Sequence, residues 1–315
     1  MLKNKMVVAG FEHSDRDRHL MKAAASLSEA MHLSVRFVHS VESKYDNPVF
    51  PVFGKEVNKI LQQIKADSLK KVEEELESLV NECGDHTSLC IKQDRAATSL
   101  MEESDAQGAW LTMVGARPGS HAFTPASLST TRALINQSER PVMVVNDEAT
   151  LDLSGEEVRI LCADDLMDGG EAAIQFAAEF AQGLGESARL QVLHVNPMTE
   201  ESLEASFQHA ILATHSQVTP AIDSGEVFRA VSAMTQTVLE QRIKQVDLDE
   251  KQLQGCVVHG QVVPSLLEAV ESFKPHVVIF GKHLRVHRRP FYFGHVPLTT
   301  AYRLNIPFVV VPKSS

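Results

Sequence analysis

The sequence predicts two tandem α/β domains, each built on a five-stranded parallel sheet covered by helices. The first observation behind this prediction is an internal repeat. Near the end of each half, an apolar run closes on a glycine (Gly115 or Gly281) and a proline-led apolar strand follows (from Pro141 or Pro307). The offset is 166 residues for both pairs (281 − 115 and 307 − 141). The second observation is that strand-like and helix-like segments alternate in both halves, which is typical of a parallel sheet.

The first half reads as five strands separated by four helices. The segments expected as strands are residues 5–11, 33–39, 87–91, 110–115 and the run from Pro141. The segments expected as helices, which carry apolar residues at spacings of three and four, are residues 15–31, 57–79, 96–106 and 130–136. This order predicts parallel strands joined by right-handed crossovers.

The second half repeats that order after an acidic linker over residues 146–156, so we expect domains at residues 1–148 and 155–315. The segments expected as strands are residues 158–163, 189–195, 255–259, 276–281 and the run from Pro307. The segments expected as helices are residues 170–183, 227–246 and 264–273. Residues 196–225 form a polar insertion without a counterpart in the first half, and we expect it to be a loop or a short helix.

Composition excludes several classes of protein. With 315 residues and 43% hydrophobic side chains, each half can bury a core. A formal net charge of −11 opposes whole-chain attraction to nucleic acid or to an anionic membrane. No run approaches the ~20 apolar residues of a membrane span, and the apolar start is too short for a signal peptide. The four cysteines show no CxxC spacing and are expected to be reduced, so the cytoplasm is the expected compartment.

Ligands of open parallel sheets bind beyond the carboxyl ends of the strands, so the residues that follow each strand are the candidate site. In the first half these are Glu12-His13-Ser14, His39-Ser40-Val41 and Gly115-Ala116-Arg117. In the second half they are Asp164-Asp165, His194-Val195-Asn196 and Gly281-Lys282-His283. His39 and His194 occupy matching positions, and we interpret both as structural histidines.

Both halves resemble the universal stress protein family, and the tandem layout resembles its two-domain, E-type members. The motifs that carry the resemblance are VVAGFEHS and ILCADD at the first strands, VRFVHSVES and LQVLHVNP at the second strands, and the endings PVMVV and PFVVV. The resemblance implies a HUP (adenine nucleotide alpha hydrolase-like) fold in each domain and a role in stress response. It also implies a pseudo-dimer in which residues 142–145 pair antiparallel with residues 308–311.

Members of this family that bind ATP carry an Asp after the first strand and a loop of the form Gly-x-x-Gly, nine residues, then Gly-Ser/Thr. Small residues there let backbone N–H groups approach the phosphates. In the first half the frame keeps Gly115 but has Pro118 as the second glycine and Leu128-Ser129 as the final pair, with Glu12 in place of the Asp. The first domain is therefore expected not to bind ATP in the family's manner.

The second half retains more of the pattern. It keeps Asp165, Gly281 and Gly294, although Leu284 replaces the second glycine and His295 stands at the Ser/Thr position. The resemblance therefore implies that ATP or another adenine nucleotide, if bound, is held by the second domain. The residues expected there are Asp165, Val195, Gly281, Lys282, His283, Gly294 and His295. The degenerate first site comprises Glu12, Val41, Gly115 and Ser129.

Several interpretations of function stay open on the sequence. The leading one is a stress-response binding or signalling protein rather than a dedicated enzyme. Its candidate partners are a small phosphorylated ligand and a second pseudo-dimer, and no membrane or nucleic-acid partner is expected. A second is an ATP sensor or weak ATPase acting through the second domain. A third assigns anion, RNA or protein docking to the basic residues 282–289, which are otherwise a solvated loop. His283 and His287 have metal-ligand spacing but no third ligand, so no metal site is expected.

Overall fold

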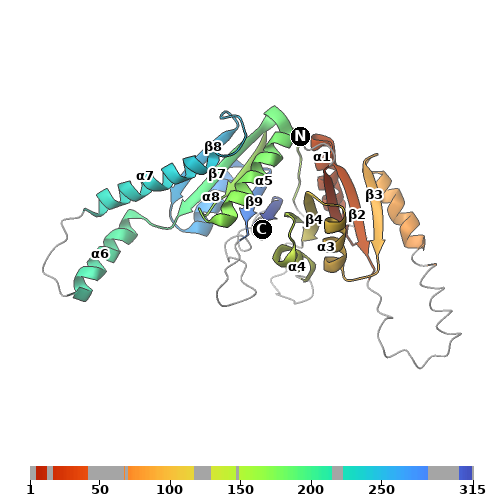
Figure 1. The fold of residues 1–315 in the computed structure, drawn as a ribbon, viewed down its shortest axis with the longest axis horizontal. Coiled ribbons are helices and arrows are strands. Elements are labelled where there is room, and N and C mark those ends of the chain that lie inside the picture. The colour runs from red at the N-terminus through yellow and green to blue at the C-terminus, as the bar shows by residue number, and fades with distance from the viewer. Residues whose placement is uncertain are drawn as a thin grey trace, which may run out of the picture. The chain divides into compact units, whose positions relative to one another are not determined.

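The computed structural model describes residues 5–12, 17–41, 67, 70–116, 129–146, 149–214, 223–282 and 305–313. The chain divides into two compact units (Figure 1). The first contains Met1–Ser154 and Asn305–Pro307, and the second contains Gly155–Leu304 and Phe308–Ser315. Each unit has its own sheet and helices, as the internal repeat predicts.

The first unit is built on five parallel strands in the order β3-β2-β1-β4-β5. The strands are β1 (Met6–Phe11), β2 (Ser34–Ser40), β3 (Thr87–Lys92), β4 (Leu111–Ala116) and β5 (Val142–Asn146). The helices are α1 (Asp17–Met31), α3 (Ala96–Ala106) and α4 (Ser129–Gln137), and residues 70–81 are also helical. Every residue of β5 is buried, as expected for an apolar strand of a sheet covered on both faces.

The second unit repeats this architecture with the strand order β10-β9-β6-β7-β8, again parallel throughout. Its strands are β6 (Val158–Ala163), β7 (Ala188–Asn196), β8 (Leu253–His259), β9 (Val277–Gly281) and β10 (Phe308–Val311). Its helices are α5 (Asp168–Leu184), α6 (Glu200–Thr214), α7 (Ser224–Ile243) and α8 (Val262–Phe273), with a 3₁₀ turn, η1 (Gly185–Ser187).

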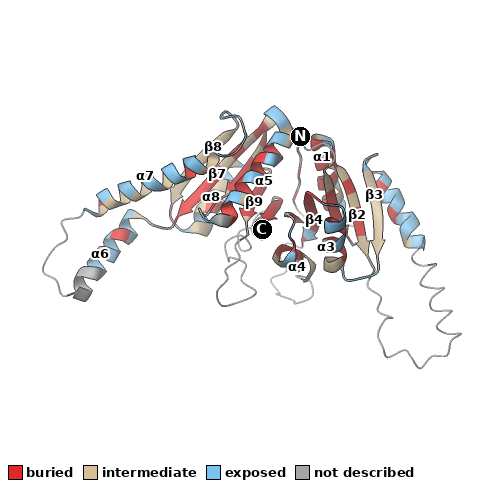
Figure 2. Ribbon diagram, viewed as in Figure 1, coloured by how far each residue is buried: buried red, intermediate tan, exposed pale blue. Residues whose placement is uncertain are grey.

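Helices cover both faces of each sheet because all crossovers are right-handed while the strand order reverses direction once in each unit. The helices before the reversal therefore lie on one face and those after it on the other. In the first unit α3 packs on α4 and on β1 and β2, and α1 packs on the same strands from the other face. In the second unit α5 packs on β6, β7, β9 and β10, and α7 packs on β8. Helix α8, which connects β8 to β9, packs on β6 and β7. Figure 2 shows the buried residues gathered in the strands and along the sheet-facing sides of these helices.

The polar insertion differs from expectation, because residues 200–214 form the 15-residue helix α6 rather than a loop or a short helix. Leu203 is buried, and most of the other described side chains of α6 are exposed. Leu203, Phe207 and Ile211 recur at four-residue intervals, which is a helical spacing, but the polar composition of the insertion favours a loop or a short helix. The antiparallel pairing of residues 142–145 with 308–311 stays a prediction.

Candidate functional site

The predicted site of the second unit lies at the carboxyl edge of its sheet. Because β6 lies between β7 and β9 and all three run parallel, their carboxyl ends meet at one edge. Asp165 follows β6 and is exposed, Val195 is buried near the end of β7, and Gly281 ends β9. Lys282 follows Gly281, is half-buried, and donates its N–H to the carbonyl of Val311 at 2.8 Å.

The carboxylate that organises this edge is that of Asp164, beside the predicted Asp165. Its side chain is fully buried, and the side chain of Arg242, which approaches it from the end of α7, is only 13% exposed. The distance from Arg242 Nη1 to Asp164 Oδ1 is 3.3 Å. Asp164 Oδ1 also accepts the N–H of Leu166 at 2.9 Å. A buried carboxylate requires such partners, since desolvation disfavours its charged form.

Arg242 also holds the backbone of the loop that follows β6. Its Nη1 donates to the carbonyl of Met167 at 3.0 Å and its Nη2 to the carbonyl of Leu166 at 2.6 Å. Leu166 has φ of +61°, a left-handed conformation that costs a non-glycine residue on the order of 1–3 kcal/mol. Both polar backbone groups of Leu166 are thus tied, to Asp164 and to Arg242, and these bonds stabilise the strained turn.

Burial raises the pKa of Asp164 above its ordinary value, and the backbone N–H of Leu166 and the charge of Arg242 offset only part of this effect. The exposed Asp165 is also engaged locally, because its Oδ1 accepts the N–H of Met167 at 3.0 Å. The loop therefore presents one carboxylate to solvent and uses the other as an internal anchor.

Two glycines allow α5 to start close to this edge. A Cβ on Gly281 would overlap the carbonyl oxygen of Gly169, and a Cβ on Gly170 would overlap Oδ1 of Asp164. Both positions therefore require glycine for close approach rather than for an unusual φ. Gly281, which the family resemblance assigns to a phosphate loop, here lies against the backbone at the start of α5.

The first unit is built differently at the matching position. His39 Nδ1 donates to the carbonyl of Phe11 at 3.1 Å, and His194 Nδ1 donates to the carbonyl of Asp164 at 2.8 Å. These equivalent bonds identify Phe11 as the counterpart of Asp164, and they confirm a structural use of both histidines. Phe11 packs edge-on against Phe37 with ring centroids 5.8 Å apart. An aromatic contact thus replaces the carboxylate and its arginine.

The other predicted residues of the first site lie at the carboxyl edge of that sheet. Glu12 follows β1, is exposed, and donates its N–H to Asp17 Oδ1 at 3.1 Å. Val41 follows β2 and donates its N–H to the carbonyl of Lys92 at 2.9 Å. Gly115 lies in β4, and Ser129 is the first residue of α4. In the second unit, His283, Gly294 and His295 lie outside the described residues.

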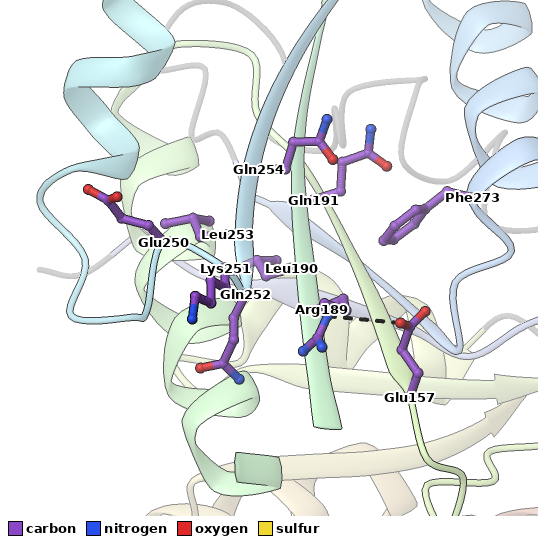
Figure 3. Close-up of a pocket in the computed structure, with 10 residues that line it drawn as sticks. All are labelled: Glu157, Arg189, Leu190, Gln191, Glu250, Lys251, Gln252, Leu253, Gln254 and Phe273. Carbon is purple, nitrogen blue, oxygen red and sulfur yellow. Dashed lines mark ion pairs between the residues drawn. The ribbon is translucent and has the colours of Figure 1, made fainter. Parts of the chain in front are cut away.

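A shallow pocket of about 360 Å³ lies elsewhere in the second unit, at the amino ends of β7 and β8 (Figure 3). Its lining includes Arg189, Gln252 and Phe273. Arg189 donates to the carbonyls of Glu186 and Ala188, and Gln252 donates to the carbonyl of Gly185. Both side chains therefore tie down the turn after α5. This pocket lies at the opposite edge of the sheet from Asp165 and is not the predicted site.

Within the described part of the chain, His, Cys, Asp and Glu side chains form no group of three or more that could hold a metal ion. None of the helices in that part is both long enough and apolar enough to span a bilayer.

Known proteins that are similar to this chain have the same fold. The model of the universal stress protein family matches the chain twice, over residues 3–146 and 158–312. The structure of a universal stress protein from Archaeoglobus fulgidus is similar with a TM-score of 0.62 at 12% identity, covering 100% of this chain and 98% of that one. A protein of unknown function from Pseudomonas aeruginosa is similar with a TM-score of 0.56 at 13% identity, covering 98% and 92%. A search of curated proteins found no match.

Proposed function

Because this chain belongs to the universal stress protein family, we propose that it is a cytoplasmic stress-response protein that binds a small phosphorylated ligand and has no catalytic chemistry of its own. The ligand site in this proposal is the carboxyl edge of the second unit, at Asp165, Val195 and Lys282. Membership in the family supports the stress-response role. The residues at this edge support the choice of the second unit over the first.

The observation that carries the proposal is that Arg242 and Asp164 fix the loop that presents Asp165. A side chain that is already held in place loses less conformational freedom when a ligand binds to it. Asp165 is exposed and its loop is bonded at Asp164, Leu166 and Met167. A hydroxyl or amino group of a ligand could donate to this carboxylate.

The charge at this edge supports a phosphorylated ligand. Lys282 directly follows β9, and Arg285, Arg288 and Arg289 follow it in the sequence, in a chain whose net charge is −11. Cations of this kind form charge-assisted hydrogen bonds to phosphate oxygens. An adenine nucleotide is the first ligand to test, since that is what the family resemblance implies.

Binding without catalysis is supported by the sequence, which has no GxSxG nucleophile elbow, no HExxH pair and no Walker loop. The second glycine of the family's phosphate loop is also replaced, by Leu284. A branched side chain there opposes the close approach of backbone N–H groups to a triphosphate. We therefore expect binding through side chains and slow or absent turnover.

Titration calorimetry of the full chain with ATP, ADP and AMP tests the proposal. We expect binding of at least one nucleotide, an affinity at least about tenfold lower for Asp165→Ala, and no change for the matched first-unit variant Glu12→Ala. Absence of heat with all three at millimolar concentration would contradict nucleotide binding. Loss of binding in Glu12→Ala but not in Asp165→Ala would place the ligand site in the first unit and contradict the proposal.

Turnover is measured separately as phosphate released from ATP by the full chain. We expect no release above that of buffer. Release that disappears in Asp165→Ala and persists in Glu12→Ala would instead identify an ATPase in the second unit, the second interpretation that the sequence leaves open.

A further inference from the structure

The long helix α7 presents an uncharged face to solvent, which is unusual for a surface helix. Its opposite side packs on the sheet: Leu239 is buried, and Leu239 and Ile243 approach Gly255 of β8. On the outer side, five exposed residues between positions 230 and 238 carry no charge. These residues are Ala230, Ala233, Met234, Thr237 and Val238. Solvent-facing helix positions normally carry charged or strongly polar side chains.

This face, which we call the α7 seam, is spaced for contact with another helix. Ala230, Ala233, Thr237 and Gln241 follow one another at intervals of three and four residues, the spacing that keeps one stripe along an α-helix. Met234 and Val238 flank the stripe and are 68% and 41% exposed. Four of the five large apolar residues most exposed in the described part of the chain are in the second unit, and two of them are in this seam.

Charged residues stand at the two ends of the seam, and at each end an acidic residue precedes a basic one along the chain. Glu226 and Arg229 lie at its beginning, and Glu240 and Lys244 lie at its end, all four exposed. Arg229 is 3.9 Å from Asp223, and both side chains of this contact are exposed. Glu240 accepts a hydrogen bond from Gln236 of the same helix. These charges therefore remain accessible to a second helix.

The charges select the partner and its direction. If a second copy of α7 lies antiparallel along the seam, Glu226 meets Lys244 of the second copy, and Arg229 lies beside Glu240 of the second copy. Ala233 then faces Thr237, so small side chains meet at the centre. A parallel arrangement would instead oppose each charge to its own like, which is destabilising. The sequence of this one helix is thus complementary to itself in the antiparallel direction only.

We propose that the α7 seam is a homodimer interface in which two copies of the chain pack their α7 helices antiparallel about a two-fold axis. A two-fold interface uses the same patch on both partners, so each favourable pair occurs twice. The stretch from Glu226 to Lys244 spans about 27 Å of helix at 1.5 Å per residue. Contact along one helix is small compared with obligate interfaces, so the dimer is expected to be weak and concentration-dependent.

Sedimentation equilibrium of the full chain from low to high micromolar concentration tests the interface. The wild type is expected to show a monomer–dimer equilibrium that weakens with added salt. Lys244→Glu sets like charges against Glu226 twice in each dimer, and we expect its dissociation constant to rise about tenfold or more. The double variant Glu226→Lys with Lys244→Glu restores opposite charges and is expected to return within about threefold of wild type.

The matched control is Glu201→Lys, a charge reversal at an exposed position of α6 outside the seam, which is expected to leave the equilibrium unchanged. Met234→Glu, which places a charge in the seam itself, is expected to abolish dimerisation; circular dichroism checks that each variant is folded. A wild type that is monomeric throughout, a Lys244→Glu variant that dimerises normally, or a double variant that fails to recover would each overturn the proposal. None of these outcomes depends on the ligand site at Asp165.

Discussion

The two units place different chemistry at the equivalent point of their two sheets. At the end of β1 the first unit has Phe11, packed against Phe37, and at the end of β6 the second unit has Asp164, paired with Arg242. In both cases a histidine of the next strand donates to the carbonyl of that residue. The backbone arrangement is thus retained while the side chain changes from an apolar contact to a buried ion pair.

The difference teaches that a buried polar group is added together with its partner. Asp164 is tolerated because Arg242 reaches it from α7 and because Gly170 leaves room for its carboxylate. Phe11 needs no partner of this kind, since burial of its ring is favourable in itself. The second unit gains a fixed loop at the price of several mutually dependent residues.

The sharpest way to break the comparison is to place the carboxylate in the first unit without its arginine. Phe11→Asp removes a buried ring, worth about 3–5 kcal/mol, and leaves a carboxylate buried with no guanidinium beside it. We expect the first unit to lose most of its stability. The only tryptophan, Trp110, lies in this unit, so its fluorescence during urea unfolding reports the change. The exposed neighbouring variant Glu12→Asp should unfold like wild type; equal midpoints for both variants would contradict the expectation.

The complementary change removes the arginine from the second unit. Arg242→Met leaves Asp164 buried without its counter-charge, which is expected to cost about 3–5 kcal/mol. Urea unfolding followed by circular dichroism measures this loss. Lys251→Met, at an exposed position of the same unit, is the control and should change stability by less than about 0.5 kcal/mol. If the two variants unfold alike, the Asp164–Arg242 pair does not stabilise the loop.

The equivalent glycines Gly115 and Gly281 offer a matched pair of smaller effect. Gly281→Ala would drive a Cβ into the carbonyl of Gly169 and force the start of α5 to move, at about 1–3 kcal/mol. Gly115→Ala meets nothing nearer than the carbonyl of Val145 at 4.0 Å among the described residues and should be nearly neutral. Thermal unfolding of both variants compares them. A larger loss for Gly115→Ala would show that the two edges are packed the other way round.

The two units also predict opposite responses to pH. Burial favours the protonated form of Glu103 in α3, but hydrogen bonds from Lys92 and Gln107 and the charge of Arg36 outweigh this, so its pKa is lowered. Its stabilising effect is present above the unfolded pKa of about 4.3 and is lost as pH falls toward the folded value. The raised pKa of Asp164 has the opposite sign, so its titration favours folding below about 3.9 and this contribution is lost as pH rises through the folded value.

Urea unfolding of Glu103→Gln and of Asp164→Asn, measured at a series of pH values between about 3 and 7, separates these contributions. The deficit of Glu103→Gln relative to wild type should shrink as pH falls. The stability of Asp164→Asn relative to wild type should improve as pH rises from about 3.9. Parallel curves for the two variants would show that both carboxylates are perturbed in the same direction.

Much of this fold follows from the sequence, because each apolar strand and most amphipathic helices carry a local periodic signal. The internal repeat adds the domain count, and the strand ends locate Asp165, Val195 and Gly281 at one edge. Helix α6 carries only a short signal of this kind, Leu203, Phe207 and Ile211 at four-residue spacing, within an insertion whose polar composition favours a loop. Arg242 was missed for another reason: it is 78 residues from Asp164, and no local pattern indicates a pairing over that distance. The one clue in the sequence is that Arg242, a charged residue, falls near the side of α7 that faces the sheet.

The similarity of strands β5 and β10 has a consequence for how the chain folds. Both are short, fully buried and valine-rich, and each is the last strand to be made in its unit. During synthesis the first of these segments emerges long before β9 exists, so it can join β4 without competition. On refolding from denaturant both segments are present at once, and either could dock beside the wrong neighbour. A slow, concentration-independent refolding phase from such exchanged strands is therefore expected in vitro but not during vectorial synthesis.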